Sequence, residues 1–134
     1  MAVNTKLTVK TPANKVITSN NVTVTIDWDS GFGQKKTRAF IDAQKYVDLA
    51  VLRYNDKYTP KRTGALIASG QIGTDIGSGL VKYTAPYSRR MYYGINYNFN
   101  GAPQRGAKWF ERMKINHKAT ILREAAKIIG GTAK

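Results

Sequence analysis

Residues that could carry acid–base or metal chemistry are scarce in this sequence. His117 is the only histidine, and no cysteine is present. A general base needs neighbours that set its pKa, and a metal site needs several ligands. His117 has no such partners nearby in the chain, and it falls on the apolar side of a predicted helix. We therefore interpret His117 as a half-buried structural residue.

Two carboxylates and one glycine-rich turn are the remaining candidates for catalysis. Asp27 and Asp29 flank Trp28, so they point to the same face of a strand. Two carboxylates without a third ligand are a weak magnesium site, and an exposed strand end explains them better. Gly77-Ser78-Gly79 has the spacing of neither a phosphate-binding loop nor a nucleophile elbow. The sequence predicts no enzyme, no cofactor and no metal site.

A cluster of aromatic and arginine residues is the first feature that indicates binding. Aromatic rings beside arginine stack on nucleic-acid bases, but the same residue types are enriched at protein–protein interfaces. No RNA-binding signature accompanies the cluster, so we favour a subunit or neighbour interface. The residues predicted for it are Tyr87, Arg89, Arg90, Tyr92 and Tyr93.

The second feature is the basic surface of the last predicted helix. Glu111 and Glu124 are the only acidic residues after Asp75, so local ion pairs cannot neutralise it. The formal net charge of the chain is +14, a field that favours polyanions or acidic partners. The residues predicted for this polyanion or acidic-partner face are Arg112, Lys114, Lys118, Arg123 and Lys127.

The elements that must position these residues follow from hydrophobic periodicity. Alternation predicts strands over 5–10 and 22–28, with Asn20-Asn21 as a turn before the second. Apolar residues at three- and four-residue steps predict helices over about 34–56 and 108–129. Between them we expect a short helix over 63–69 that Gly70 stops, a hairpin of 71–76 with 80–84, and a long aromatic loop over 85–107.

These elements predict an α+β fold with a small antiparallel sheet and two long helices packed on one face of it. We expect a single domain over 1–134. Its parts are a β-rich segment 1–33, a helix within 34–57, a hairpin and Tyr-rich loop within 58–107, and a helix over 108–129. No apolar run approaches the roughly 18 residues of a membrane span, and no secretory signal is visible. We expect a protein made in the cytoplasm, without a membrane partner.

Several short motifs between residues 58 and 113 resemble one family of phage proteins. They are Tyr58-Thr59-Pro60, Thr63-Gly64-Ala65-Leu66, Ser69-Gly70, Tyr83, Ala85-Pro86-Tyr87, Tyr92-Tyr93-Gly94, and 106–113, which reads Gly-Ala-Lys-Trp-Phe-Glu-Arg-Met. In this order they resemble the minor capsid proteins of Gram-positive siphophages, which look like relatives of tail-completion proteins in the phage neck. The last string is the most specific.

The resemblance implies a structural virion protein at the head–tail junction. It implies a six- or twelve-fold ring of identical copies. Connector or stopper proteins on one side, and tail terminator or tail tube proteins on the other, are the expected partners. Genome DNA is expected to pass through the lumen without sequence-specific contacts.

Three alternatives remain open from the sequence. A stand-alone basic nucleic-acid-binding protein would explain the charge and the tyrosines, and it predicts tight, salt-sensitive binding by the isolated chain. A small nuclease would require His117, Asp27 or Asp29 for activity. Another neck station, such as a head-closure stopper or a tail terminator, has similar size and α+β character.

Overall fold

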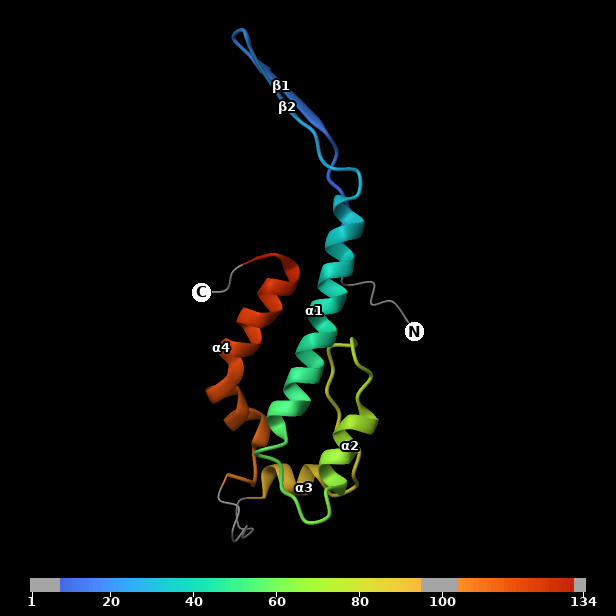
Figure 1. The fold of residues 1–134 in the computed structure, drawn as a ribbon, viewed down its shortest axis with the longest axis vertical. Helices are drawn as coiled ribbons and strands as arrows, with labels where there is room; N and C mark the ends of the chain where they lie inside the picture. The colour runs from blue at the N-terminus through green and yellow to red at the C-terminus, as the bar shows by residue number, and fades with distance from the viewer. Residues whose placement is uncertain (1–7, 95–103, 132–134) are drawn as a thin grey trace.

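The computed structural model describes residues 8–94 and 104–131. Two strands, β1 (Lys15–Ser19) and β2 (Val22–Ile26), precede four helices in the chain. The helices are α1 (Phe32–Asn55), α2 (Ala65–Gly73), α3 (Ser88–Tyr93) and α4 (Trp109–Ile129). The predicted α+β class is confirmed, and the two long helices α1 and α4 pack against each other (Figure 1).

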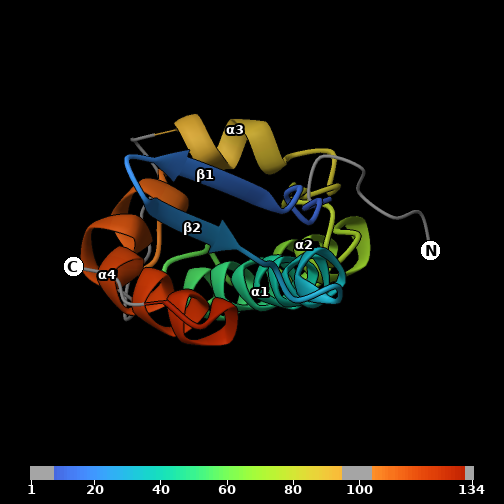
Figure 2. The ribbon, with the colours of Figure 1, turned by 90° about the horizontal axis from the view of Figure 1, so that it is seen from above.

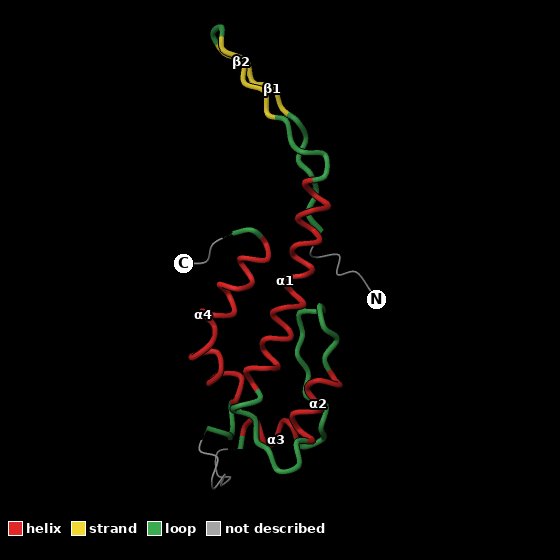
Figure 3. The backbone as a smooth tube through the Cα atoms, viewed as in Figure 1, coloured by secondary structure: helices red, strands yellow, loops and turns green. Residues whose placement is uncertain are grey.

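The two strands form one antiparallel hairpin that extends past the N-terminal end of α1 (Figures 1 and 3). Its turn is Asn20-Asn21, as predicted, and both residues have positive φ, 42° and 68°. Such angles are typical of the tight turns that match strand twist. The register pairs Ile17 with Val24 and Thr18 with Thr23.

The strand that pairs with β2 is not the one predicted from the sequence. The predicted first strand, 5–10, lies partly outside the described residues, and 8–10 form no strand. Instead Val9 pairs with α1, since its amide donates to Thr37 Oγ1 at 2.8 Å. β1 was missed because its two apolar residues, Val16 and Ile17, are adjacent and do not alternate with polar residues.

The hairpin stands apart from the helices, contrary to the expectation that the helices cover one face of the sheet. All ten strand residues of the hairpin are exposed. Figure 1 shows the hairpin beyond the N-terminal end of α1 with no helix alongside it, and in the view from above the hairpin overlaps the helices only in projection (Figure 2). The sheet therefore contributes no buried core.

The core lies between α1 and α4. Met113 and Ile121 of α4 pack with Ala50 and Val51 of α1, and Met113 is 1% exposed. The two predicted long helices are confirmed, because α1 and α4 begin and end within two residues of the predicted bounds. Gly130 ends α4 with φ 91°, a left-handed conformation that favours glycine.

The segment from 63 to 84 differs from the prediction in two ways. Gly70 does not stop a helix: it lies inside α2 and is buried. Residues 71–76 and 80–84 are not strands, since 71–73 belong to α2, although the predicted turn at 77–79 is present. The two sides are joined through Thr74, whose Oγ1 accepts from the Lys82 amide at 3.0 Å.

Part of the Thr-Gly-x-Leu and Ser-Gly pattern has a physical reason in α2. Gly64 precedes the helix with φ 84°, which a side chain would strain. Leu66 and Ser69 are buried. A Cβ on Gly70 would lie 2.6 Å from a ring carbon of Tyr83, so the glycine makes room for that ring.

Candidate assembly surfaces

The predicted aromatic and arginine residues gather on and beside α3. Tyr92 packs edge-on against Trp109 of α4, with ring centroids 4.7 Å apart, and against Tyr93 at 5.2 Å. Lys108 adds a cation over the Tyr93 ring, with Nζ 4.0 Å from its centroid. The tyrosines of α3 are therefore fixed by the start of α4.

The exposure of these residues divides them into two groups. Tyr92 is partly buried in the contact with Trp109, whereas Tyr93 is 59% exposed. Tyr87, Arg89 and Arg90 are also exposed. The structure brings the five residues together on one short helix and its N-terminal neighbour. Their role as an interface stays a prediction. Part of the predicted aromatic loop, 95–103, lies outside the described residues.

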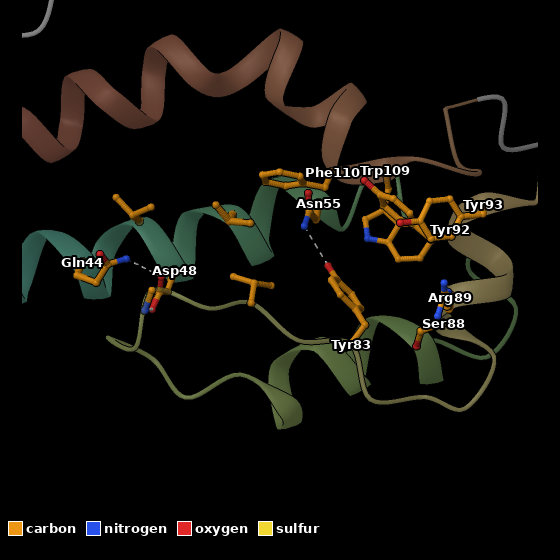
Figure 4. A pocket seen from close by; sticks show the side chains of 14 residues that line it. Gln44, Asp48, Asn55, Tyr83, Ser88, Arg89, Tyr92, Tyr93, Trp109 and Phe110 are labelled. Carbon is orange, nitrogen blue, oxygen red and sulfur yellow. Dashed lines mark hydrogen bonds between the residues drawn. The ribbon is translucent and has the colours of Figure 1, made fainter. Parts of the chain in front are cut away.

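A pocket of about 580 Å³ opens between α1, the 79–83 segment, α3 and the start of α4 (Figure 4). Its walls include the aromatic residues Tyr83, Tyr92, Trp109 and Phe110, with Asp48 at one end and Arg89 at the other. An apolar recess with a few polar groups is typical of a binding pocket.

Two polar side chains meet in this pocket. Asn55 is 1% exposed, and its Nδ2 donates to Tyr83 Oη at 3.2 Å, whereas its Oδ1 has no partner among the described residues. Burial raises the pKa of the Tyr83 phenol, with the Asn55 hydrogen bond acting in the opposite direction. Tyr83 therefore stays neutral over the whole physiological pH range.

Asp48 is a structural residue that the sequence analysis missed. It is 2% exposed, and its carboxylate accepts hydrogen bonds from Gln44 Nε2 at 2.9 Å and from the amides of Gly77 and Gly79 at 2.8 and 3.1 Å. The carboxylate fastens the 77–79 turn to α1. The available signal was an acid four residues after Gln44 on a predicted helix.

The guanidinium of Arg112 donates hydrogen bonds to backbone carbonyls of its own chain. Its Nε donates to the Ala107 carbonyl at 3.0 Å, one Nη to the Tyr58 carbonyl at 3.1 Å, and the other to the Gln104 carbonyl. Arg105 acts similarly on the carbonyls of Asp56 and Thr59. Both arginines join the segment before α4 to the residues that follow α1.

Replacing Arg112 by Lys is expected to lower the free energy of unfolding by about 2 kcal/mol. The planar guanidinium of arginine donates to three carbonyls at once, and a lysine ammonium cannot reach all three. Urea denaturation measures this change. Arg123→Lys on the same helix is the matched control, since Arg123 is exposed and, among the described residues, donates only to Thr120 Oγ1 at 3.4 Å. An equal loss in both variants would contradict the role assigned to Arg112.

The other predicted basic residues lie on two flanks of α4. At about 100° per residue, Lys114 and Lys118 fall on one side, and Arg123 and Lys127 on the other. Ion pairs join Lys114 to Glu111 at 3.1 Å and Lys127 to Glu124 at 3.2 Å. Between the flanks runs an exposed apolar stripe formed by Ile115, Ala119 and Leu122.

Two residues considered for catalysis, His117 and Asp29, make contacts that stabilise the fold. His117 stacks on Tyr54, with centroids 4.3 Å apart, and its Nε2 lies 3.4 Å from Tyr58 Oη. Asp29 accepts from Lys35 at 2.7 Å and from the Gly31 amide at 3.0 Å, and the Lys35 hydrogen bond lowers the pKa of this exposed carboxyl. Asp29 thus braces the start of α1.

Two other kinds of site are absent from the described part of the chain. Across residues 8–94 and 104–131, no three His, Cys, Asp or Glu side chains gather as a metal-ligand group. No described helix has both the length and the apolar character needed to cross a bilayer.

Comparison with known proteins gives one match. A family described as "Minor capsid protein" matches residues 22–129, from β2 to the end of α4. No curated protein and no solved structure matches the chain.

Proposed function

Because this chain belongs to the family of minor capsid proteins, we propose that it forms a ring in the phage neck, which joins the head to the tail and lets the genome pass. Membership of the family makes the chain a structural protein of the phage virion. The neck position, the ring, the passage of DNA and the absence of catalysis belong to the proposal.

The observation that carries the ring is the presence of exposed apolar groups on separate parts of the molecule. Ile17 and Val24 of the hairpin are 47% and 50% exposed, and Ile115 of α4 is 82% exposed. Large exposed apolar patches mark interaction sites. A subunit with one neighbour on each side needs two such surfaces, and head-to-tail contacts that close generate a ring.

The α3 residues are proposed as a further contact with a neighbouring copy or neck protein. Tyr87, Arg89, Arg90 and Tyr93 combine exposed aromatic area with guanidinium groups, the residue types that dominate interface energetics. Tyr92 supports them from its packing on Trp109. The adjacent pocket gives a recess for an apolar side chain of that neighbour.

The basic residues are proposed to face DNA or acidic partner proteins. The net charge of +14 supports contact with phosphates that does not depend on sequence. Lys114, Lys118, Arg123 and Lys127 remain in the proposed face, whereas the guanidinium of Arg112 is engaged by carbonyls. Connector or stopper proteins and tail terminator or tail tube proteins are the proposed neighbours.

Electron microscopy of virions with an epitope tag after Lys134 tests this proposal. We expect antibody label confined to the head–tail junction, with a ring in averaged images of that region. Label spread over the head, or along the tail, would contradict the neck position. Label absent from virions, with the chain on intracellular nucleic acid, would favour the nucleic-acid-binding alternative.

A further inference from the structure

A group of basic residues lies at the end of the molecule opposite the hairpin, outside the faces described above. In Figure 1 this end is formed by the 56–64 loop, α3 and the segment that leads into α4. Residues 56–64 and 104–108 together hold five basic residues and one acid. Four of the basic residues are exposed, and they are named here the basic end: Lys57, Lys61, Arg62 and Lys108.

Backbone hydrogen bonds hold the segments of this end together. The Gly106 amide donates to the Tyr58 carbonyl at 2.9 Å, which joins 104–108 to the loop that follows α1. The Lys108 amide donates to the Tyr92 carbonyl at 2.9 Å, which joins the same segment to α3. The 104–108 segment therefore lies between the loop and α3, and the fold brings Lys108 to the same end as the three basic residues of the loop.

The charges of the basic end are not neutralised within the described part of the chain. Asp56 is the one acid of the two segments, and its carboxylate lies 3.7 Å from the guanidinium of Arg105. Across residues 8–94 and 104–131, no carboxylate lies within 4.0 Å of a basic group of the basic end. Four exposed cations are therefore available to an anion outside this copy.

The basic flanks of α4 have different surroundings. Lys114 and Lys127 are paired with glutamates, and between the flanks runs the exposed apolar stripe, in which Ile115 is 82% exposed. An apolar centre with a charged rim is the composition of a protein–protein interface. Among the described residues, no large apolar side chain is exposed in 56–64 or 104–108. Such a surface suits phosphates, which are bound by basic and hydroxyl groups without an apolar centre.

We propose that the basic end binds the phosphate backbone of the genome DNA. Of the two partners proposed above for the basic residues, DNA then belongs to the basic end, and the acidic proteins belong to the flanks of α4. The contact needs no base recognition, because lysine and arginine neutralise phosphates whatever the sequence. This inference rests on the proposed passage of DNA through the neck.

Photo-cross-linking in intact virions tests this assignment. Phage carrying Lys61→p-benzoylphenylalanine is expected to give, on irradiation, an adduct of the chain that migrates slowly on a denaturing gel and disappears after nuclease treatment. Lys118→p-benzoylphenylalanine is the matched control, since Lys118 is also an exposed lysine but lies on a flank of α4. Its adduct is expected to resist nuclease, because its partner is a protein.

Each outcome of the cross-linking decides the assignment. A nuclease-resistant adduct at Lys61 would overturn it in favour of an acidic protein at this end, and the absence of any adduct there would overturn it too. Nuclease-sensitive adducts at both positions would overturn the division between the two basic surfaces. The epitope label on Lys134 reports the neck position independently, so its absence from the junction overturns the proposed function itself.

Binding of the purified chain to duplex DNA at low salt gives a second readout. Lys61→Gln with Arg62→Gln is expected to weaken binding and to lower the slope of log affinity against log salt concentration by about 2, since each lost phosphate contact removes about 0.9. Lys118→Gln with Arg123→Gln removes the same charge and is expected to keep the native slope. Equal reductions in both double variants, with native melting temperatures, or no binding by the native chain, would overturn the assignment.

Discussion

Replacing Asp48 by Ala is expected to lower the free energy of unfolding by about 3 kcal/mol, because the carboxylate accepts three hydrogen bonds and is almost fully buried. Without it the amides of Gly77 and Gly79 lose their acceptor, and the 77–79 turn separates from α1. Equilibrium unfolding in urea measures the loss as a lower midpoint with an unchanged slope.

Asp42→Ala provides the control for this prediction. Asp42 lies on the same helix but is exposed, so its loss is expected to change stability by less than about 0.5 kcal/mol. Asp48→Asn keeps one carbonyl oxygen as acceptor and is expected to fall between the two. If Asp48→Ala were as stable as Asp42→Ala, the clip between the turn and α1 would contribute nothing to folding.

Met113→Ala is expected to cost a similar amount, about 3 kcal/mol, because it leaves a cavity between α1 and α4. Met113 is 1% exposed and packs with Ala50, Val51 and Ile121. Thermal unfolding followed by circular dichroism would show this as a drop in Tm of several degrees, on the order of 10 °C for a domain of this size.

Ile115→Ala is the matched variant for Met113→Ala. It lies two residues away on α4 and is 82% exposed, so its Tm is expected to stay within about 2 °C of the native value. Ile115→Ala also removes part of the exposed apolar stripe of α4. It therefore distinguishes a loss of assembly from a loss of folding. Equal destabilisation by both substitutions would place the core elsewhere.

The long helices and the Asn turn could be predicted because their signals are local. Apolar residues such as Phe40, Val47 and Val51 recur at helical spacing along α1, and Gly130 gives α4 a left-handed end. Asn20 and Asn21 accept positive φ without a partner elsewhere in the chain. Periodicity and turn chemistry are sufficient for such elements.

The elements that were predicted wrongly depend on contacts between distant residues. Gly70 was interpreted as a helix stop, but its lack of a Cβ accommodates the ring of Tyr83, thirteen positions later in the sequence. The 71–76 segment alternates like a strand, yet α2 continues to Gly73 because Leu66 and Ser69 are buried by tertiary packing. No local pattern contains that information.

For the assembly surfaces, the sequence showed where certain residue types cluster, but not which of them bind other parts of the chain. The five aromatic and arginine residues at 87–93 lie on α3 and at Tyr87 directly before it. The sequence does not distinguish Arg112 from Arg123. In the structure, only Arg112 of these two donates hydrogen bonds to carbonyls of a distant segment. The exposed apolar stripe on α4 was not predicted, because charged residues lie on either side of it.

The pairing of the first long helix with the last determines when the fold can close during synthesis. Half of the core belongs to α4, and buried Ala125 lies 70 residues after Asn55, the end of α1. Ribosomes add roughly 5–20 residues per second. The apolar side of α1 therefore waits several seconds for its partner, and the core closes only after α4 has been synthesised. Nascent chains stalled before α4 should stay protease-sensitive, however well the hairpin and α1 have already formed.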